Sequence, residues 1–372
     1  MRDWIKYKLE DVCSRLSSGK GIPSKLVSEE GDYPVYGGNG IRGYTTSSNF
    51  KGDCAIIGRQ GAYCGNVRYF AGEAYMTEHA VVVCANEKNC TRYLAYLLST
   101  MNLGRLSGQS AQPGLSVKTL GKQEIIIPQR DEQVKIAELL GIFDEKIKQN
   151  EEINDNLLQQ ARTLFHQWLS DTSGEVHCLS EIANINQETY SPKSNWDYIN
   201  YLDTSSITDG KISEVQYIQP SVDKIPSRAR RILKQGDIVF STVRPNQLHY
   251  GIVSNPLPNM LGSTGFAVIR SNASAIPNEI IYLALTEPSF IEQMQQIAEQ
   301  SVSTFPSIRP SDLDACNIPT PQEGEGEIIA AIQALFAESA ANNEENIRLS
   351  LLRDTLLPKL MFGELDVSNI NI

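Results

Sequence analysis

The residues best suited to chemistry in this sequence are arginines and side-chain amides in two short polar loops. One loop covers residues 58–63 (GRQGAY), and the other covers residues 241–247 (STVRPNQ). Arginine makes paired hydrogen bonds to the edge of guanine, and glutamine or asparagine makes them to adenine. The two loops therefore predict contact with the base edges of DNA. The alternative interpretation of each residue, taken singly, is a solvated surface side chain.

Further polar and basic residues lie at matching places in the two halves of the chain. Residues 109–112 (QSAQ) precede Lys118, and residues 300–301 (QS) precede Arg309, so both halves offer donors for phosphates or bases. Residues 228–234 hold three arginines and a lysine, which would give the second half a basic face. The candidate DNA-contacting residues are Lys20, Asn39, Arg42, Arg59, Gln60, Gln109, Lys118, Arg228, Arg230, Arg231, Arg244, Asn246, Gln247 and Arg309.

A search for catalytic motifs argues against an enzyme. Residues 38–43 (GNGIRG) fit the dinucleotide-binding pattern G-x-G-x-x-G, but such a site needs a helix to begin there, and residues 44–49 (YTTSSN) favour loop or strand. Residues 19–21 (GKG) lack the Ser/Thr and the first glycine of a phosphate loop. The sequence holds no nucleophile elbow, no metal-ligand spacing and no Asn/Asp-Pro-Pro-aromatic tetrapeptide. We therefore expect no catalytic site, metal or cofactor in this chain.

Length and composition are those of a multidomain cytoplasmic protein. The 372 residues, 41% hydrophobic and 21% charged, are enough for two or three domains with their own cores. No apolar run approaches the roughly 20 residues that cross a bilayer, and the start of the sequence has no signal-peptide pattern. The seven cysteines, an odd number without a C-x-x-C pair, argue against a disulfide framework. We expect a cytoplasmic protein without a membrane segment.

The net charge of −11 is distributed unevenly along the chain. Residues 1–130 hold 16 Lys/Arg against 11 Asp/Glu, whereas residues 172–320 hold 10 against 15. Residues 131–171 hold 4 against 9, and residues 321–372 hold 3 against 9. The second half must therefore bind DNA through a local basic face. Its acidity favours the alternative of a non-catalytic scaffold whose heads bind proteins.

The chain contains one internal repeat. Residues 9–12 (LEDV) match residues 179–182 (LSEI), and residues 51–56 (KGDCAI) match residues 235–240 (QGDIVF). The offset between matching segments grows from 170 to 193 along the chain, so the two halves share a frame and differ by insertions in loops. The repeat predicts two similar mixed α/β heads, which cover residues 1–130 and residues 173–321, each with one helix, near residues 91–100 and 277–298 respectively.

Each half ends in a long helical pattern, predicted for residues 131–172 and 322–372. Apolar residues recur at a spacing of three and four in both patterns. In the middle of each pattern, polar residues take the place of the apolar ones; these include Asn150, Asn154, Asn342 and Asn346. Asparagines between paired helices fix their register at some loss of stability. We therefore expect an antiparallel helix pair, about 57 Å long, that separates the heads and relates them by an approximate two-fold axis. In the alternative, each helix covers its own head.

Three motifs, taken together, are specific enough to indicate a protein family. They are the opening Trp4-x-x-Tyr7-x-Leu9-x-x-Val12, residues 33–44 (YPVYGGNGIRGY), and the junction Leu120-x7-Pro128-x4-Gln133-x2-Ile136-x3-Leu140. With these motifs, the chain resembles the specificity (S) subunit of type I restriction-modification systems over its whole length. The second half departs from the pattern: it lacks the YGGNG segment, and residues 323–327 (EGEGE) replace the usual entry to its helix.

The resemblance implies an α/β (α+β) fold in which two target recognition domains, separated by the helix pair, each read one part of a split asymmetric DNA site. It implies that the helices set the unread gap and dock DNA methyltransferase (M) subunits, which methylate adenine. Restriction (R) subunits would join them to cleave unmodified DNA. S-adenosylmethionine, ATP and Mg are then expected in the partner subunits and none of them in this chain. The expected partners are double-stranded DNA and these two kinds of subunit.

Overall fold

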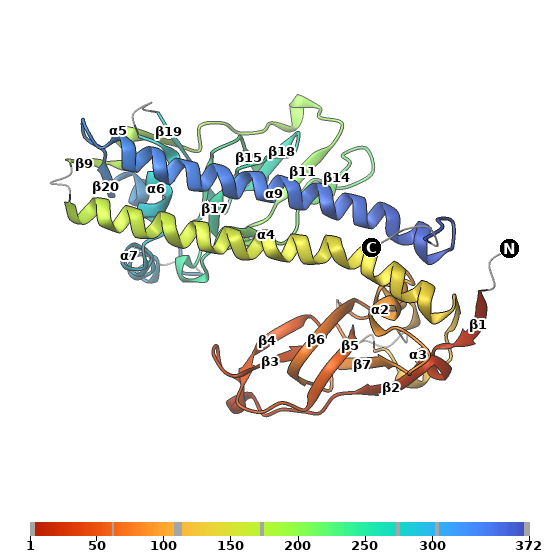
Figure 1. Cartoon of the computed structure of the whole chain (residues 1–372). Coiled ribbons are helices and arrows are strands. Elements are labelled where there is room, and N and C mark those ends of the chain that lie inside the picture. Colours follow the sequence, from red (N-terminus) through yellow and green to blue (C-terminus); the bar gives the residue numbers. More distant parts are fainter. Residues whose placement is uncertain are drawn as a thin grey trace. The chain divides into compact units, whose positions relative to one another are not determined.

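Two heads and two long helices make up the chain (Figure 1). The computed structural model describes residues 4–61, 63–107, 114–171, 175–272, 276–301 and 305–367. The chain divides into two compact units: the first unit holds residues 1–148 and 346–372, and the second holds residues 149–345. Each unit therefore contains one head together with one end of each long helix.

The first head is a six-stranded sheet with helices packed against it. Its elements are β1 Ile5–Lys8, α1 Leu9–Val12, β2 Cys13–Ser18, η1 Ser24–Leu26, β3 Tyr33–Gly37, β4 Gly40–Thr45, β5 Phe50–Gly58, β6 Val67–Met76, β7 Ala80–Ala85, α2 Thr91–Ser99, η2 Leu103–Leu106, α3 Val117–Gly121 and β8 Glu124–Ile127. The strand order is β2-β7-β5-β6-β3-β4, and β1 pairs with β8 in a separate ribbon. The apolar runs 54–57 and 80–83 are buried in the central strands β5 and β7.

One core joins this sheet to the long helices α4 (Arg130–Asp171) and α9 (Gly326–Met361). It consists of fully buried apolar side chains, among them Ile57, Val83, Leu94, Leu98, Ile136, Leu140, Leu360 and Met361. Each such side chain contributes roughly 1.5–3 kcal/mol relative to an exposed position. The beginning of α4 and the end of α9 are therefore held firmly in the first unit.

The second head contains two four-stranded sheets. Its elements are β9 Glu175–Cys178, α5 Leu179–Ile182, β10 Ala183–Ile185, η3 Pro192–Ser194, β11 Ile199–Leu202, η4 Thr204–Ser206, β12 Ile207–Thr208, β13 Lys211–Ile212, β14 Gln216–Ile218, β15 Ala229–Ile232, β16 Ile238–Ser241, η5 Pro245–Gln247, β17 Tyr250–Ile252, β18 Met260–Ser263, β19 Phe266–Ser271, α6 Asn278–Leu285, α7 Pro288–Glu299, α8 Pro310–Asp314 and β20 Asn317–Thr320. The sheets have the orders β10-β19-β16-β17 and β14-β11-β18-β15, β9 pairs with β20, and β12 with β13.

The strand orders confirm the internal repeat. The order β2-β7-β5-β6 in the first head corresponds to β10-β19-β16-β17 in the second, with antiparallel neighbours throughout. The ribbon β1–β8 corresponds likewise to β9–β20. The first head adds β3 and β4 to the shared core, whereas the second adds a separate sheet from residues 199–232 and 260–263. These additions account for the growing offset between the two halves.

The second head has two helices where the sequence pattern predicts one over residues 277–298. The single-helix prediction is wrong because α6 ends at Leu285 and α7 begins at Pro288. A proline disfavours the helical conformation of the residue before it, and Glu287 is accordingly extended. Pro288 itself occupies the first turn of α7, where its missing N–H costs nothing.

The long helices run antiparallel in both units. In the first unit, Arg353 Nη1 of α9 lies 2.7 Å from Asp144 Oδ1 of α4. In the second unit, Asn342 Nδ2 lies 2.9 Å from Asn154 Oδ1, and Ala161 of α4 is buried in the core of the second head. Residue numbers that rise along α4 therefore meet falling numbers along α9. Because both helices contribute to both units, the alternative in which each helix covers its own head is excluded.

Candidate nucleic-acid interface

One hairpin loop occupies the same place in both heads. Loop 59–66 joins β5 to β6, and loop 242–249 joins β16 to β17. Each loop begins with backbone contacts to the segment before a short helix, α3 or α8. These contacts are the hydrogen bonds from Leu115 N to Arg59 O (2.8 Å) and from Ile308 N to Thr242 O (2.9 Å), and the β-bridges Gln60–Gly114 and Val243–Ser307. The two loops are therefore structural counterparts.

The arginines of the two loops do not occupy equivalent positions. The carbonyls of Arg59 and Thr242 accept equivalent backbone hydrogen bonds, from Leu115 and Ile308 respectively, so the two residues correspond to each other. By the same register, Arg244 corresponds to Gly61. The loops match as the repeat predicts, but their arginines lie two positions apart. The shared scaffold thus presents different hydrogen-bond donors in the two heads.

Close backbone packing brings loop 59–66 against the turn between β3 and β4. A Cβ atom on Gly58 would lie 2.5 Å from Gly38 O, so only glycine permits this approach. The turn that follows Gly38 carries the exposed Asn39. The structure thereby places Asn39 next to Arg59, although the strands β4 and β5 separate them in sequence.

Four basic side chains gather at this end of the first head. They are Lys20, Arg42, Arg59 and Arg68. Arg59 Nη1 lies 3.4 Å from Ser18 Oγ, at the end of the strand that leads to Lys20. Arg42 packs across Gly37, and Arg68 lies against Gly40 at the same β3–β4 turn. In the part of the chain that the structure describes, no carboxylate forms an ion pair with any of the four. Such uncompensated cations suit DNA phosphates.

Arg68 is a residue that the sequence patterns did not single out. It follows Val67 at the start of β6, in a run without a loop or turn signal. Arg68 pairs with Ile56 of β5, and a Cβ atom on Gly40 would lie 3.4 Å from its guanidinium carbon, so it is the tertiary structure that brings Arg68 to the β3–β4 turn. Burial raises the pKa of the neighbouring Tyr36, and the charge of Arg68 opposes that rise. Tyr36 therefore stays a neutral neighbour of this basic cluster.

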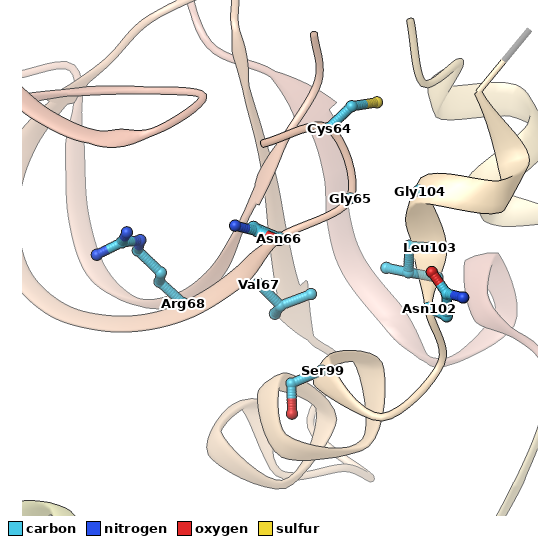
Figure 2. A pocket seen from close by; sticks show the side chains of 9 residues that line it. All are labelled: Cys64, Gly65, Asn66, Val67, Arg68, Ser99, Asn102, Leu103 and Gly104. Carbon is cyan, nitrogen blue, oxygen red and sulfur yellow. The ribbon is translucent and has the colours of Figure 1, made fainter. Parts of the chain in front are cut away.

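A polar pocket of about 450 Å³ lies beside loop 59–66 (Figure 2). It is lined by Cys64, Gly65, Asn66, Val67, Arg68, Ser99, Asn102, Leu103 and Gly104. One wall is the loop with the start of β6, and the other is the end of α2 with η2. Figure 2 shows Val67 and Leu103 directed toward each other, whereas Arg68 extends away from η2. The pocket therefore marks where α2 meets the loop that carries Arg59.

Loop 242–249 holds its arginine in an unusual conformation. Arg244 has φ 49° and ψ 69°, a left-handed conformation that is costly for a residue with a side chain, and it precedes a proline. Its backbone N–H donates to Pro306 O at 2.9 Å. Its guanidinium carbon lies 5.0 Å from the ring centre of Phe305, a cation–π distance. Backbone strain of this kind is found at functional sites, where the surroundings hold it in place.

The other candidates of the second loop face solvent. Asn246 and Gln247 are exposed, and the backbone N–H of Asn246 donates to Gln295 Oε1 of α7 at 3.3 Å. The exposed Arg309 is tied to Asp312 at the start of α8, with Nη2 3.1 Å from Oδ1. Arg309 is therefore partly neutralised, unlike Arg244.

The arginine run of the second head is divided between exposed and half-buried positions. Arg228 is exposed, and its carbonyl accepts a hydrogen bond from Thr264 N (2.8 Å) near the start of loop 242–249. Arg230 and Arg231 are half-buried on β15. Among the described residues, Arg230 Nη1 and Arg231 Nε have no hydrogen-bond partner, and burial lowers the pKa of Arg231. These two N–H groups can therefore donate hydrogen bonds to a bound anion.

Lys234 does not contribute to a basic face, contrary to the sequence prediction. Its ammonium pairs with Glu188, whose carboxylate also binds Arg270 Nη1 at 2.9 Å. These two hydrogen bonds lower the pKa of Glu188. Arg270 in turn binds the fully buried Asp237, with Nε 2.6 Å from Oδ1. Lys234 thus belongs to an ion-pair network that links three segments of the second head.

Two candidates remain apart from these groups. Lys118 is exposed on α3. Gln109 lies outside the described residues. The role of each in DNA contact stays a prediction.

The asparagines of the helix pair meet polar partners. Asn154 exchanges 2.9 Å hydrogen bonds with Asn342 and Asn343, and Asn150 donates to Glu345 Oε2 at 2.7 Å. Asn346 belongs to the first unit and is half-buried on α9. Asn150 thus donates to a carboxylate of α9. Their function in fixing the register stays a prediction.

The described residues offer neither a cluster of metal ligands nor a membrane-spanning helix. Within them, no three His, Cys, Asp or Glu side chains come together as metal ligands would. None of the helices that the structure describes has the length and apolar character to span a bilayer. All seven cysteines lie in described segments and are free thiols.

The observed features define an internally duplicated protein with two unlike heads on a pair of antiparallel helices. Comparison with known proteins agrees with this class. The family model for the type I restriction modification DNA specificity domain matches residues 1–159 and 174–351. The chain therefore belongs to the family of type I restriction-modification specificity subunits.

Individual relatives differ in how much of the chain they match. The specificity subunit of the type I restriction enzyme EcoprrI of Escherichia coli is 41% identical over 143 residues, which cover 37% of this chain and 36% of that protein. The specificity subunit of the enzyme MjaIX of Methanocaldococcus jannaschii is 24% identical over 99% of this chain and 95% of its own length. A crystal structure of an S subunit from M. genitalium has a TM-score of 0.59 at 17% identity and covers 96% of both chains. That likeness shows a shared fold.

Proposed function

We propose that this chain selects the DNA on which a type I restriction-modification complex acts, with each head reading one part of a split asymmetric site. Residues 1–130 and 173–321 would be the two target recognition domains, and α4 (Arg130–Asp171) and α9 (Gly326–Met361) the spacer helices. The observation that carries two-part reading is the equivalence of loops 59–66 and 242–249. Their backbones match, but their arginines do not.

The chemistry of each loop supports contact with DNA. In the first head, the cluster of Lys20, Arg42, Arg59 and Arg68 has no ion-pair partner in the described segments, and Asn39 and Gln60 offer amides beside it. In the second head, the half-buried Arg244 is held at a cation–π distance from the ring of Phe305. Cations that contact phosphates supply affinity, and the amides and the oriented guanidinium supply sequence selectivity.

The partners follow from family membership and are part of the proposal. The spacer helices would dock methyltransferase subunits that carry S-adenosylmethionine, and restriction subunits that use ATP and Mg would join them. Specificity is then this chain's contribution, and catalysis is theirs.

Salt dependence of DNA binding tests the assignment of the basic cluster. The complex of this chain with its methyltransferase subunit is titrated with duplex DNA at several salt concentrations. Neutralising a cation that contacts a phosphate reduces the slope of log affinity against log salt by about 0.9. We expect that reduction for Arg68→Gln and Lys20→Gln, and none for Lys6→Gln, which is a matched lysine paired with Glu124 on the β1–β8 ribbon. Equal slopes for all variants would contradict the proposed interface, and no salt-dependent binding to duplex would favour a protein scaffold.

A further inference from the structure

The first head is attached to the long helices by a polar joint. The joint consists of Arg92 and Tyr96 of α2, Asp144 of α4 and Arg353 of α9, all in the first unit. Tyr96 Oη donates to Asp144 Oδ2, and Arg353 Nη1 donates to Asp144 Oδ1 at 2.7 Å. Burial raises the pKa of Tyr96, so its phenol remains the donor. A single carboxylate thus connects the head to both long helices.

Arg92 completes the joint through a close approach to the backbone of α4. Its Nη2 donates to Gly141 O at 3.3 Å, and its Nη1 donates to Glu145 Oε1 at 2.8 Å. Its guanidinium carbon also lies 5.2 Å from the ring centre of Tyr69 in the sheet. A Cβ atom on Gly141 would lie 2.6 Å from that carbon, so glycine makes room for the arginine. A glycine inside a helix costs up to about 1 kcal/mol relative to alanine, and here it has this packing role.

The second unit has an apolar arrangement at the corresponding positions. The offset of 192 residues between the helical patterns places Phe336 where the first unit has Asp144, and Ala161 where it has Arg353. Phe336 packs edge-on against Tyr282 of α6 with ring centres 5.8 Å apart, and Ala161 is buried. The second head does contact α4 through Arg162, whose Nη1 donates to Thr286 O at 3.4 Å, but no carboxylate occupies the position of Asp144. Half-buried ion pairs add little net stability, but their directional hydrogen bonds restrict geometry.

We propose that Asp144 and Gly141 are positioning residues that fix the angle of the first head on the helix pair, and thereby the length of the unread gap that the protein accepts. This inference rests on the proposed function. The polar joint restricts the angle through directional hydrogen bonds to Tyr96, Arg92 and Arg353, where an apolar contact would allow sliding.

The helix α2 connects the joint to the DNA-facing loop. It begins near Arg92 and ends at Ser99, which lines the pocket beside loop 59–66 (Figure 2). Nine residues of α-helix span about 13 Å, so a tilt of about 15° at the joint moves the far end of α2 by about 3 Å. That displacement is close to the rise of one base pair, about 3.4 Å. A loosened joint therefore admits gaps that differ by one base pair.

Mapping of adenine methylation in cells tests the inference. The full-length chain and its variants Asp144→Asn, Tyr96→Phe and Gly141→Ala are each expressed with the methyltransferase subunit. For every variant we expect the two half-site sequences to stay unchanged. We expect methylation of sites with a gap one base pair longer or shorter to rise about tenfold relative to the correct gap. Gly141→Ala separates positioning from stability, because alanine improves the helix while it displaces Arg92.

The outcomes separate this inference from the proposed function. A split motif with an unchanged gap preference in all three variants would overturn the positioning role and leave the function standing. Relaxed bases within a half-site would also overturn it, since the joint would then act on base reading. If the unaltered chain directs no split motif, the proposed function fails, and the inference fails with it.

Discussion

The guanidinium carbon of Arg244 lies 5.0 Å from the ring centre of Phe305. The backbone N–H of Arg244 donates to the carbonyl of Pro306, the residue that follows Phe305. The aromatic ring covers one face of the guanidinium and leaves its planar edge for a base. The backbone of Arg244 is left-handed, which is costly for a residue with a side chain. The second head thus holds a donor in place before DNA binds, which lowers the ordering cost of binding.

Replacing Arg244 with alanine is expected to relax the second half-site only. Loss of a bidentate base contact costs about 1–3 kcal/mol of discrimination. Arg59→Ala is the reciprocal control, because its loop occupies the equivalent place in the first head and should relax the first half-site only. The measurement is the binding affinity for the cognate duplex and for duplexes with a single substitution in either half. An equal loss of affinity for cognate and random DNA would show that the arginine contacts a phosphate and not a base.

Shortening both long helices together is expected to change the gap and leave both half-sites intact. Residues 147–153 of α4 face residues 343–349 of α9, as the Asn154–Asn342 and Asn150–Glu345 contacts indicate. Removing both segments shortens the pair by about 10 Å. This corresponds to about three base pairs. The methylated motif of the doubly deleted chain reports the gap directly. A changed half-site sequence with an unchanged gap would contradict the spacer role.

The Asn154–Asn342 contact is expected to fix the register of the two helices and to make the pair less stable than an apolar contact would. Replacing Asn154 alone with leucine leaves the amide of Asn342 without its partner and should lower the free energy of unfolding by about 1 kcal/mol. Replacing both with leucine should restore or raise it, because two apolar side chains then meet. Urea unfolding of the two variants measures the difference. If the double variant is less stable than the single one, the two asparagines do not act as a pair.

The ion pair between Arg270 and Asp237 is expected to support the second head strongly. Asp237 is fully buried, so Arg270→Met leaves an uncompensated charge, which costs roughly 3–5 kcal/mol. The matched control is Lys234→Met, which breaks the exposed pair with Glu188 and should cost about 1 kcal/mol or less. Urea unfolding measures both. Similar losses for the two variants would show that burial of Asp237 does not set the difference.

Much of the fold could be predicted from the sequence because the duplication left matching segments in the two halves. The repeat of residues 51–56 at 235–240 predicts that β5 and β16 are equivalent strands, and the strand orders confirm it. The heptad pattern of residues 131–172 predicts a long helix, and α4 runs from Arg130 to Asp171. The break between α6 and α7 was also readable, since Pro288 ends any helix before it.

The site was less predictable because its residues meet through tertiary structure. Arg68 reaches the β3–β4 turn only in the folded head, and Phe305 meets Arg244 only because the segments that carry them pack together. Lys234 looked like part of a basic face, but its partner Glu188 lies 46 residues earlier in the chain. Neither the spacing nor the residue type of these side chains carries that information.

The most direct measurement is adenine methylation mapping of DNA from cells that express this chain with and without its neighbouring methyltransferase subunit. We expect a split, asymmetric motif, with two specific parts and a fixed unread gap, that appears only when both proteins are present. With both proteins shown to be expressed and associated, the absence of any new motif would contradict the specificity role. That result would leave a paired-helix scaffold as the better description of this protein.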